Sequence, residues 1–209
     1  MEIANFFPIP IGRVKLQREL NQKEINQIEN LKKYSRINLD SNRGSIDNNI
    51  LDNEIFSDLK RMLLKHLNEY LKNVADPDRD IQLYITNSWI NWNDNGTGHH
   101  PHHHPNSLIS GVLYIDTDEL DTITFLKPGN NHIFGNIEGF SNGVPTKWLS
   151  DNWTIPAIKN NLLIFPSVLK HKVLPRPNTC KRTRISISFN SWFSGILGDS
   201  HYSNKLKMY

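Results

Sequence analysis

The chain has 209 residues, of which 37% are hydrophobic and 22% are charged, as in a typical globular domain. This length is sufficient for one domain with a buried core. The net charge of +3 is too small to indicate a nucleic-acid partner, and the single cysteine, Cys180, excludes an intrachain disulfide. No apolar stretch is long enough to span a bilayer and no secretory signal pattern is seen, so we expect a cytoplasmic protein without a membrane partner.

The first part of the chain favours helices. The segment 21–34 repeats apolar residues with a helical period, and Asn21 with Glu24 three residues later has the pattern of a capping box. The segment 55–71 carries a leucine at every fourth position, which is typical of an amphipathic helix that packs on a core. We therefore expect residues 1–80 to form an N-terminal helical support region.

From residue 81 the pattern changes to short runs rich in β-branched and aromatic residues, separated by clusters of glycine, asparagine and proline. The expected strands cover 81–92, 108–116, 122–126, 162–165, 171–174 and 184–193. Helices followed by many short strands predict a mainly β fold with N-terminal helices, in which the helices pack on one face of a sandwich or barrel. Residues 81–193 would form its core and 194–209 a C-terminal tail of the same domain.

The segment 129–153 is long and irregular, and it contains several glycines and two tryptophans. Loops of this length are usually functional or mobile. It is a candidate substrate lid, and a structural loop packed by its tryptophans is an equally good interpretation.

Five of the nine histidines lie between residues 99 and 104. Imidazole is a common ligand of catalytic transition metals. On an extended chain, residues two apart share a face, so His102 and His104 would point the same way and His103 the opposite way. The run therefore predicts two ligands of a metal site; the alternative is a surface tract that binds metal loosely.

Two further features could complete such a site. His171 follows an apolar strand and a short turn, where a third ligand could come from an opposing strand, although a lone histidine is more often structural. Arg184 and Ser186 share the polar face of an alternating strand and could clamp a carboxylate. By alternation alone, an exposed polar face with a solvated arginine is the more frequent outcome.

Four blocks of sequence, taken together, resemble the 2-oxoglutarate- and iron(II)-dependent oxygenases of marine phages and bacteria, which are distant relatives of the prolyl hydroxylases. The blocks are NSWIN (87–91), HHHPNSLISGVLY (102–114), FPSVLKHKVLP (165–175) and RISISFN (184–190). The resemblance implies a double-stranded β-helix, or jelly roll, whose open end holds Fe(II). It also implies a dioxygenase that uses 2-oxoglutarate and O2 and hydroxylates a small-molecule or peptide substrate, with succinate as the second product. A phage-encoded member would act in the cytoplasm of the host cell.

The resemblance also assigns metal ligands. His102 and His171 match the two histidines of the family's metal triad, and His104 occupies the position at which broader relatives carry aspartate or glutamate. Three imidazoles would leave the metal site one charge more positive than the usual set of two histidines and one carboxylate.

Cosubstrate contacts follow from the same resemblance. Arg184 matches the residue that pairs with the distal carboxylate of 2-oxoglutarate, with Ser186 beside it, while Tyr114 and Asn87 are candidates to line the pocket. Two alternatives stay open: a cupin-like or zinc-dependent enzyme, which would not require Arg184, and a non-catalytic metal-binding jelly-roll module.

Overall fold

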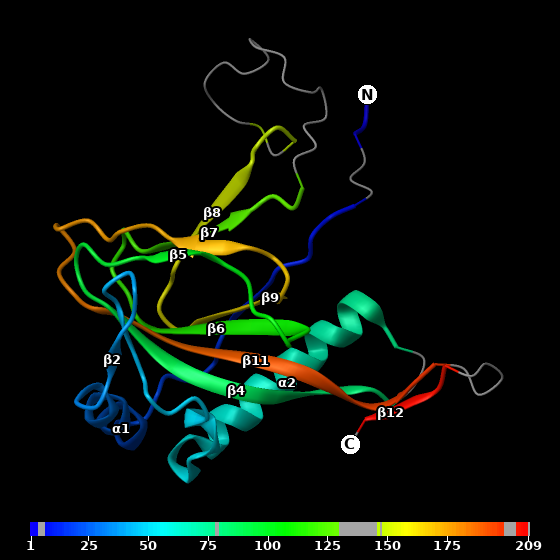
Figure 1. The fold of residues 1–209 in the computed structure, drawn as a ribbon, viewed down its shortest axis with the longest axis horizontal. Coiled ribbons are helices and arrows are strands. Elements are labelled where there is room, and N and C mark those ends of the chain that lie inside the picture. Colours follow the sequence, from blue (N-terminus) through cyan, green and yellow to red (C-terminus); the bar gives the residue numbers. More distant parts are fainter. Residues whose placement is uncertain (4–6, 78–79, 130–145, 147, 199–203, 209) are drawn as a thin grey trace.

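The computed structural model describes the chain except residues 4–6, 78–79, 130–145, 147, 199–203 and 209 (Figure 1). The larger sheet contains β1 (Gly12–Lys15), β2 (Arg36–Ile37), β3 (Arg43–Gly44), β4 (Gln82–Asn93), β6 (Ile109–Asp116), β9 (Asn161–Pro166), β11 (Arg184–Leu197) and β12 (Leu206–Met208). The smaller sheet contains β5 (His99–His102), β7 (Thr122–Leu126), β8 (Asn152–Pro156) and β10 (His171–Val173). The helices are α1 (Gln22–Lys32) and α2 (Ser57–Ala75), with short 3-10 turns η1 (Ile50–Asp52) and η2 (Glu54–Phe56). The predicted mainly β class with N-terminal helices is confirmed.

All named strand pairs are antiparallel. The larger sheet has the order β1-β9-β6-β11-β4-β3-β2, with β12 paired to β11, and the smaller sheet has the order β5-β10-β7-β8. Several paired strands are far apart in sequence, such as β1 with β9 and β5 with β10, and β11 lies in the middle of the larger sheet between β4 and β6 (Figure 1).

Both predicted helices are present. The capping box at α1 is confirmed, because the Asn21 side chain accepts a hydrogen bond from the Glu24 N–H and the Glu24 carboxylate accepts one from the Asn21 N–H. Glu24 has no exposed surface and forms an ion pair with Arg18 at 2.7 Å. The second helix begins and ends later than the sequence pattern indicates, since α2 continues to Ala75. None of the described helices combines the length and the apolar content that a bilayer-spanning helix needs.

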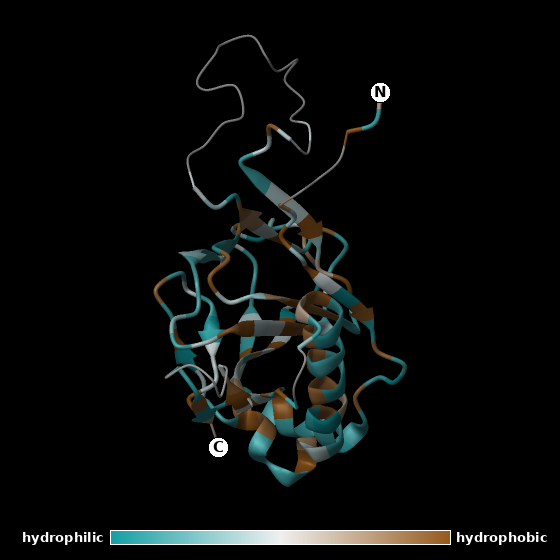
Figure 2. Cartoon of the chain, turned by 90° about the vertical axis from the view of Figure 1, so that its right-hand side faces the viewer, coloured by the Kyte–Doolittle hydropathy of each residue, from teal (hydrophilic) through white to brown (hydrophobic). Residues whose placement is uncertain are grey.

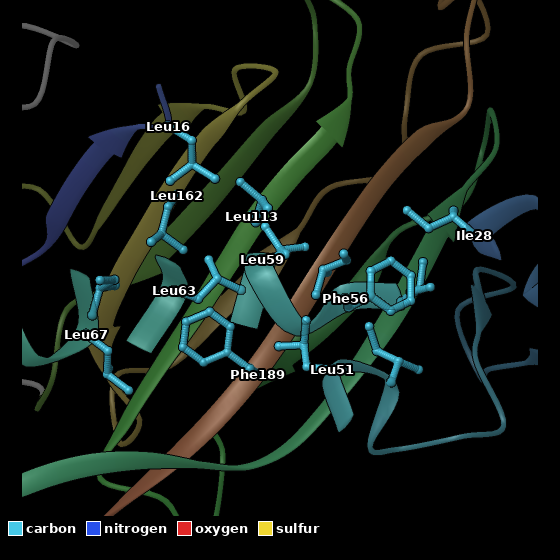
Figure 3. Close-up of a cluster of buried hydrophobic side chains, with 14 of the residues drawn as sticks. Leu16, Ile28, Leu51, Phe56, Leu59, Leu63, Leu67, Leu113, Leu162 and Phe189 are labelled. Atoms are coloured by element: carbon cyan, nitrogen blue, oxygen red, sulfur yellow. The ribbon is translucent and has the colours of Figure 1, made fainter. Parts of the chain in front are cut away.

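The helices cover one face of the larger sheet. Leu59, Leu63 and Leu67 of α2 are fully buried and belong to one cluster with Ile187 and Phe189 of β11 (Figure 3). Figure 2 shows α2 carrying both hydrophobic and hydrophilic residues, as an amphipathic helix should. The leucine stripe is therefore core packing, as predicted.

A second apolar cluster joins the larger sheet to the smaller one. It contains Phe165 of β9 and Phe125 of β7, whose ring centroids lie 5.1 Å apart in an edge-to-face arrangement. The larger sheet is thus buried on both faces, by helices on one side and by the smaller sheet on the other. Arg184, Ser186 and Ser188 of β11 lie on the face that is covered by the smaller sheet.

The predicted strands are all found, within a few residues of their expected ends. The turn before β9 contains Asn160 with φ 65°, a left-handed conformation that asparagine tolerates well. The segment 129–153 differs from expectation at its end, because β8 begins at Asn152 and pairs with β7. Most of that segment, and with it the lid hypothesis, lies outside the described residues. The N-terminal region also contributes strands β1, β2 and β3 to the larger sheet.

Candidate metal and cosubstrate site

A cavity lies between the two sheets. Strands β4, β6 and β11 line it from the larger sheet, and β5 and β10 from the smaller one. Its lining includes all three predicted metal ligands, together with Arg184 and Ser186, so residues from distant parts of the sequence meet in one place. The full set is Trp89, Asn91, Asn93, His99, His102, His104, Gly111, Val112, Tyr114, Ile123, Phe165, His171, Val173, Arg184, Ser186 and Ser188.

Strand pairing brings the three histidines together. His102 is the last residue of β5 and lies directly opposite His171, the first residue of β10. His104 follows two residues after β5, and the ligand atoms of the three rings all lie within 4.8 Å of one another. His103 is exposed, and it belongs to neither candidate metal group found among the described residues.

Each of the three imidazoles is held through its Nδ1 atom. The Nδ1 of His102 lies 2.8 Å from the carbonyl oxygen of His100, and that of His171 lies 3.0 Å from the carbonyl oxygen of Leu169. The Nδ1 of His104 lies 2.6 Å from Asn190 Oδ1. These oxygens can only accept hydrogen bonds, so each Nδ1 carries the proton and each Nε2 presents a lone pair. This arrangement of outer partners is the one found around histidines that bind metals.

The Nε2 atoms of His104 and His171 lie only 3.3 Å apart. Burial lowers the pKa of His104 to about 4 and that of His171 to about 3, and the nearby His102 ring contributes further to both decreases. Both rings are therefore neutral at neutral pH, and two lone pairs face each other. Such an arrangement is favourable when a cation lies between the lone pairs, so this donor set fits a divalent transition metal.

A buried polar network supports His104. Asn190 Oδ1 also accepts a hydrogen bond from Ser110 Oγ at 2.8 Å, and Ser110 Oγ lies 2.8 Å from Ser167 Oγ. On its other side His104 stacks on Trp89, with ring centroids 5.5 Å apart. The role of Asn190 is not predicted from the sequence, although the residue continues the polar face that begins at Arg184.

The described residues contain no carboxylate within the three-histidine group. The two acids nearest to the histidine run in the sequence have other partners, because Asp94 accepts a hydrogen bond from Thr183 and Asp116 from Arg182. In the part of the chain that the structure describes, the third member of this group is therefore a histidine, His104.

Arg184 is only 4% exposed, which contradicts the alternative of a solvated arginine on an exposed sheet face. Its Nη1 donates to the Thr122 carbonyl oxygen and its Nη2 to Asn93 Oδ1, both at 3.1 Å, while its Nε has no hydrogen-bond partner among the described residues. No carboxylate among the described residues forms an ion pair with it, whereas buried Arg176 pairs with Asp121 at 2.6 Å. Burial lowers the pKa of Arg184. A buried guanidinium is costly unless it is paired, and none of the described carboxylates forms an ion pair with Arg184, so this end of the cavity favours an anion.

Tyr114 and Ser186 lie directly opposite each other on β6 and β11, and both line the cavity. Burial raises the pKa of Tyr114 to about 12, so its hydroxyl stays protonated and can donate a hydrogen bond. Asn87 is placed differently. It lies on β4 beyond Trp89 and is not part of the cavity lining, to which Asn91 and Asn93 of the same strand contribute instead.

The sequence matches a known protein family over the span that contains the cavity. A family model described as "Putative 2OG-Fe(II) oxygenase" matches residues 87–190, a span that contains every residue lining the cavity. No curated protein matches the sequence.

Several solved structures share the fold. The α-ketoglutarate-dependent epimerase SnoN from nogalamycin biosynthesis has a TM-score of 0.61 and 13% identity over 88% of this chain and 78% of its own. HygX from Streptomyces hygroscopicus, with nickel and 2-oxoglutarate bound, has a TM-score of 0.58 and 10% identity over 88% and 82%. A Pseudomonas putida prolyl-4-hydroxylase has a TM-score of 0.51 and 13% identity over 88% and 94%. At these identities the similarity shows the fold.

The match to the 2OG-Fe(II) oxygenase family model over residues 87–190, together with the fold and the cavity described above, indicates an oxidoreductase that uses iron(II), 2-oxoglutarate and O2.

Proposed function

We propose that His102, His104 and His171 hold iron(II) at the open end of a double-stranded β-helix, and that Arg184 binds the distal carboxylate of 2-oxoglutarate. The reaction would couple oxidative decarboxylation of 2-oxoglutarate to hydroxylation of a C–H bond. One O2 and one 2-oxoglutarate are consumed, one oxygen atom enters the substrate as hydroxyl and the other enters succinate, and CO2 leaves. Iron(II) supplies the activation of O2 in this reaction.

One observation carries the proposal: the buried Arg184, which has no carboxylate partner among the described residues, lines the same cavity as the three converging imidazoles. A dicarboxylate that chelates a metal at one end and meets a guanidinium at the other satisfies both groups at once. A hydrolytic zinc enzyme would require only the three histidines and a water. The arginine is therefore the feature that favours the oxygenase.

In this reaction the side chains of the protein would bind the metal and the cosubstrate, orient them and shield them from solvent. The oxygens of His100, Leu169 and Asn190 hold the three rings with Nε2 toward the cavity. Three neutral imidazoles leave the full charge of a divalent metal uncompensated, so a dianionic cosubstrate gains more attraction here than at a site with a carboxylate ligand.

The decisive experiment is anaerobic addition of Fe(II) and then 2-oxoglutarate to the metal-free protein, with absorption spectroscopy. We expect a charge-transfer band that requires both additions, and succinate formation once O2 and a substrate are supplied. A zinc enzyme would show no such band and would be active with Zn²⁺. A binding module would take up metal and form no succinate with any substrate.

The substrate would be sought by succinate release across two panels. HygX has been solved with hygromycin B bound and SnoN with nogalamycin RO, so the first panel contains these two compounds and small molecules related to them. The prolyl-4-hydroxylase similarity suggests proline-containing peptides for the second. Mass spectrometry would then show a gain of one oxygen atom in the true substrate.

A further inference from the structure

Two histidines of the run, His99 and His100, take no part in the three-histidine group. The structure brings them together with Asp40, which lies between β2 and β3, about sixty residues earlier in the chain. One ligand atom from each of the three side chains lies within 4.8 Å of the others. This second group shares no residue with the first.

The contacts of Asp40 fix this arrangement. Its Oδ2 accepts hydrogen bonds from the backbone N–H of His100 at 2.7 Å and lies 2.6 Å from His100 Nδ1. Its backbone carbonyl accepts a hydrogen bond from the N–H of Gly98 at 3.4 Å, so the turn is tied to β5 on both sides of His99. The carboxylate is ionised, because its hydrogen bonds with His100 hold its pKa below the usual value.

His99 connects the two groups in space. Its ring stacks on His102, with centroids 4.1 Å apart and an interplanar angle of 23°, and it lines the cavity. The side chains of His100 and Asp40 are 50% and 32% exposed, so solvent can complete the coordination of an ion held there. The group thus lies at the solvent-facing rim of the buried site.

We propose that Asp40, His99 and His100 form a second site for a divalent transition-metal ion such as Ni²⁺ or Zn²⁺. Two imidazoles and one carboxylate are a donor set that late first-row metals prefer over Mg²⁺ or Ca²⁺. The site is weaker than the three-histidine site, because the ion must displace the hydrogen bond between Asp40 and His100 and is repelled by a cation already bound nearby. Its formation does not depend on the proposed reaction.

The test is a count of Ni²⁺ ions bound to the untagged, metal-free full chain by equilibrium dialysis at neutral pH, followed by elemental analysis. The wild type is expected to bind two ions, one tightly and one weakly. His100→Ala removes one donor but keeps the backbone groups that contact Asp40 and His102, so it should lose only the weakly bound ion. Asp40→Asn, which keeps an acceptor for the backbone N–H of His100, should do the same.

His103→Ala is the matched control, because it removes an exposed histidine of the same run and should leave both ions bound. A single bound ion in the wild type, or two in His100→Ala, would overturn the proposal. Loss of the weak ion from His103→Ala as strongly as from His100→Ala would show a loose histidine tract instead. His171→Ala distinguishes failure of the three-histidine site from failure of the second site. This variant should lose the tightly bound ion and keep the weakly bound one. Retention of both ions would count against the three-histidine site and not against the second site.

Discussion

Replacement of Arg184 by methionine tests the proposed cosubstrate contact directly. Methionine is unbranched and apolar and can occupy much of the same buried space, while it removes the guanidinium. Each hydrogen bond from a charged group is worth about 1.5–3 kcal/mol, so a fork that makes two of them contributes about 3–6 kcal/mol. At about 1.4 kcal/mol per factor of ten, the dissociation constant of 2-oxoglutarate should rise about 10²- to 10⁴-fold.

The effect on the metal should be small, because no metal-ligating atom of the three-histidine group belongs to Arg184. The assay is anaerobic titration of the Fe(II)-loaded variant with 2-oxoglutarate, with Fe(II) affinity measured separately. Arg182→Met is the matched control, since Arg182 is two residues away, is exposed, and pairs with Asp116 outside the cavity. If Arg184→Met lost metal affinity and cosubstrate affinity equally, the role proposed for Arg184 as the cosubstrate contact would be refuted. The same would follow if Arg182→Met lost as much cosubstrate affinity as Arg184→Met.

Four other outcomes are expected. His171→Ala should abolish tight iron binding whereas His103→Ala should not, as measured by metal analysis; equal effects would mean that the alternating-face argument fails. Asn190→Ala should weaken Fe(II) binding about 10- to 100-fold, because His104 loses its Nδ1 acceptor, and an unchanged affinity would remove Asn190 from the site. The metal-free protein should lose stability to urea as the pH falls from 6.5 toward 3. The reason is that His104 and His171 take up a proton near pH 6.5 in the unfolded chain, but only near pH 4 and pH 3 in the folded protein. A stability that does not change over this pH range would contradict the burial of these two rings. Leu63→Ala should lower the free energy of unfolding by about 2–5 kcal/mol, since that side chain is fully buried, and a loss below about 1 kcal/mol would count against the packing of α2 on the sheet.

Much of the fold can be predicted because its signals are local. The capping box of Asn21 and Glu24, the leucine stripe of α2 and the alternation in β11 each depend on residues close together in sequence. The short edge strands carry weaker signals. The irregular segment predicted for 129–153 overlaps only the first two residues of β8, whose sequence NWTIP ends in proline and forms a strand by pairing with β7.

The candidate site could be predicted in part for the same reason. The histidine run and the alternation after Arg184 identify residue types and faces, and the resemblance strengthens the prediction of His171 as a third ligand. Asn87 lies on the same face of β4 as the cavity-lining residues Trp89, Asn91 and Asn93, so the alternation alone could not exclude it from the site. The cavity begins only at Trp89, because its extent depends on which segment of β4 faces the smaller sheet.

The sequence by itself determined the elements, the faces of the strands and the set of chemically suitable side chains, since periodicity and residue type are local properties. Tertiary structure decided which of those side chains meet. Pairing of β5 with β10 brings His102 opposite His171, and the turn at Asp40 reaches His100. Burial between two sheets then makes the histidines neutral and leaves Arg184 without a carboxylate partner among the described residues. These properties depend on distances across the fold and on exclusion of water, which no local pattern specifies.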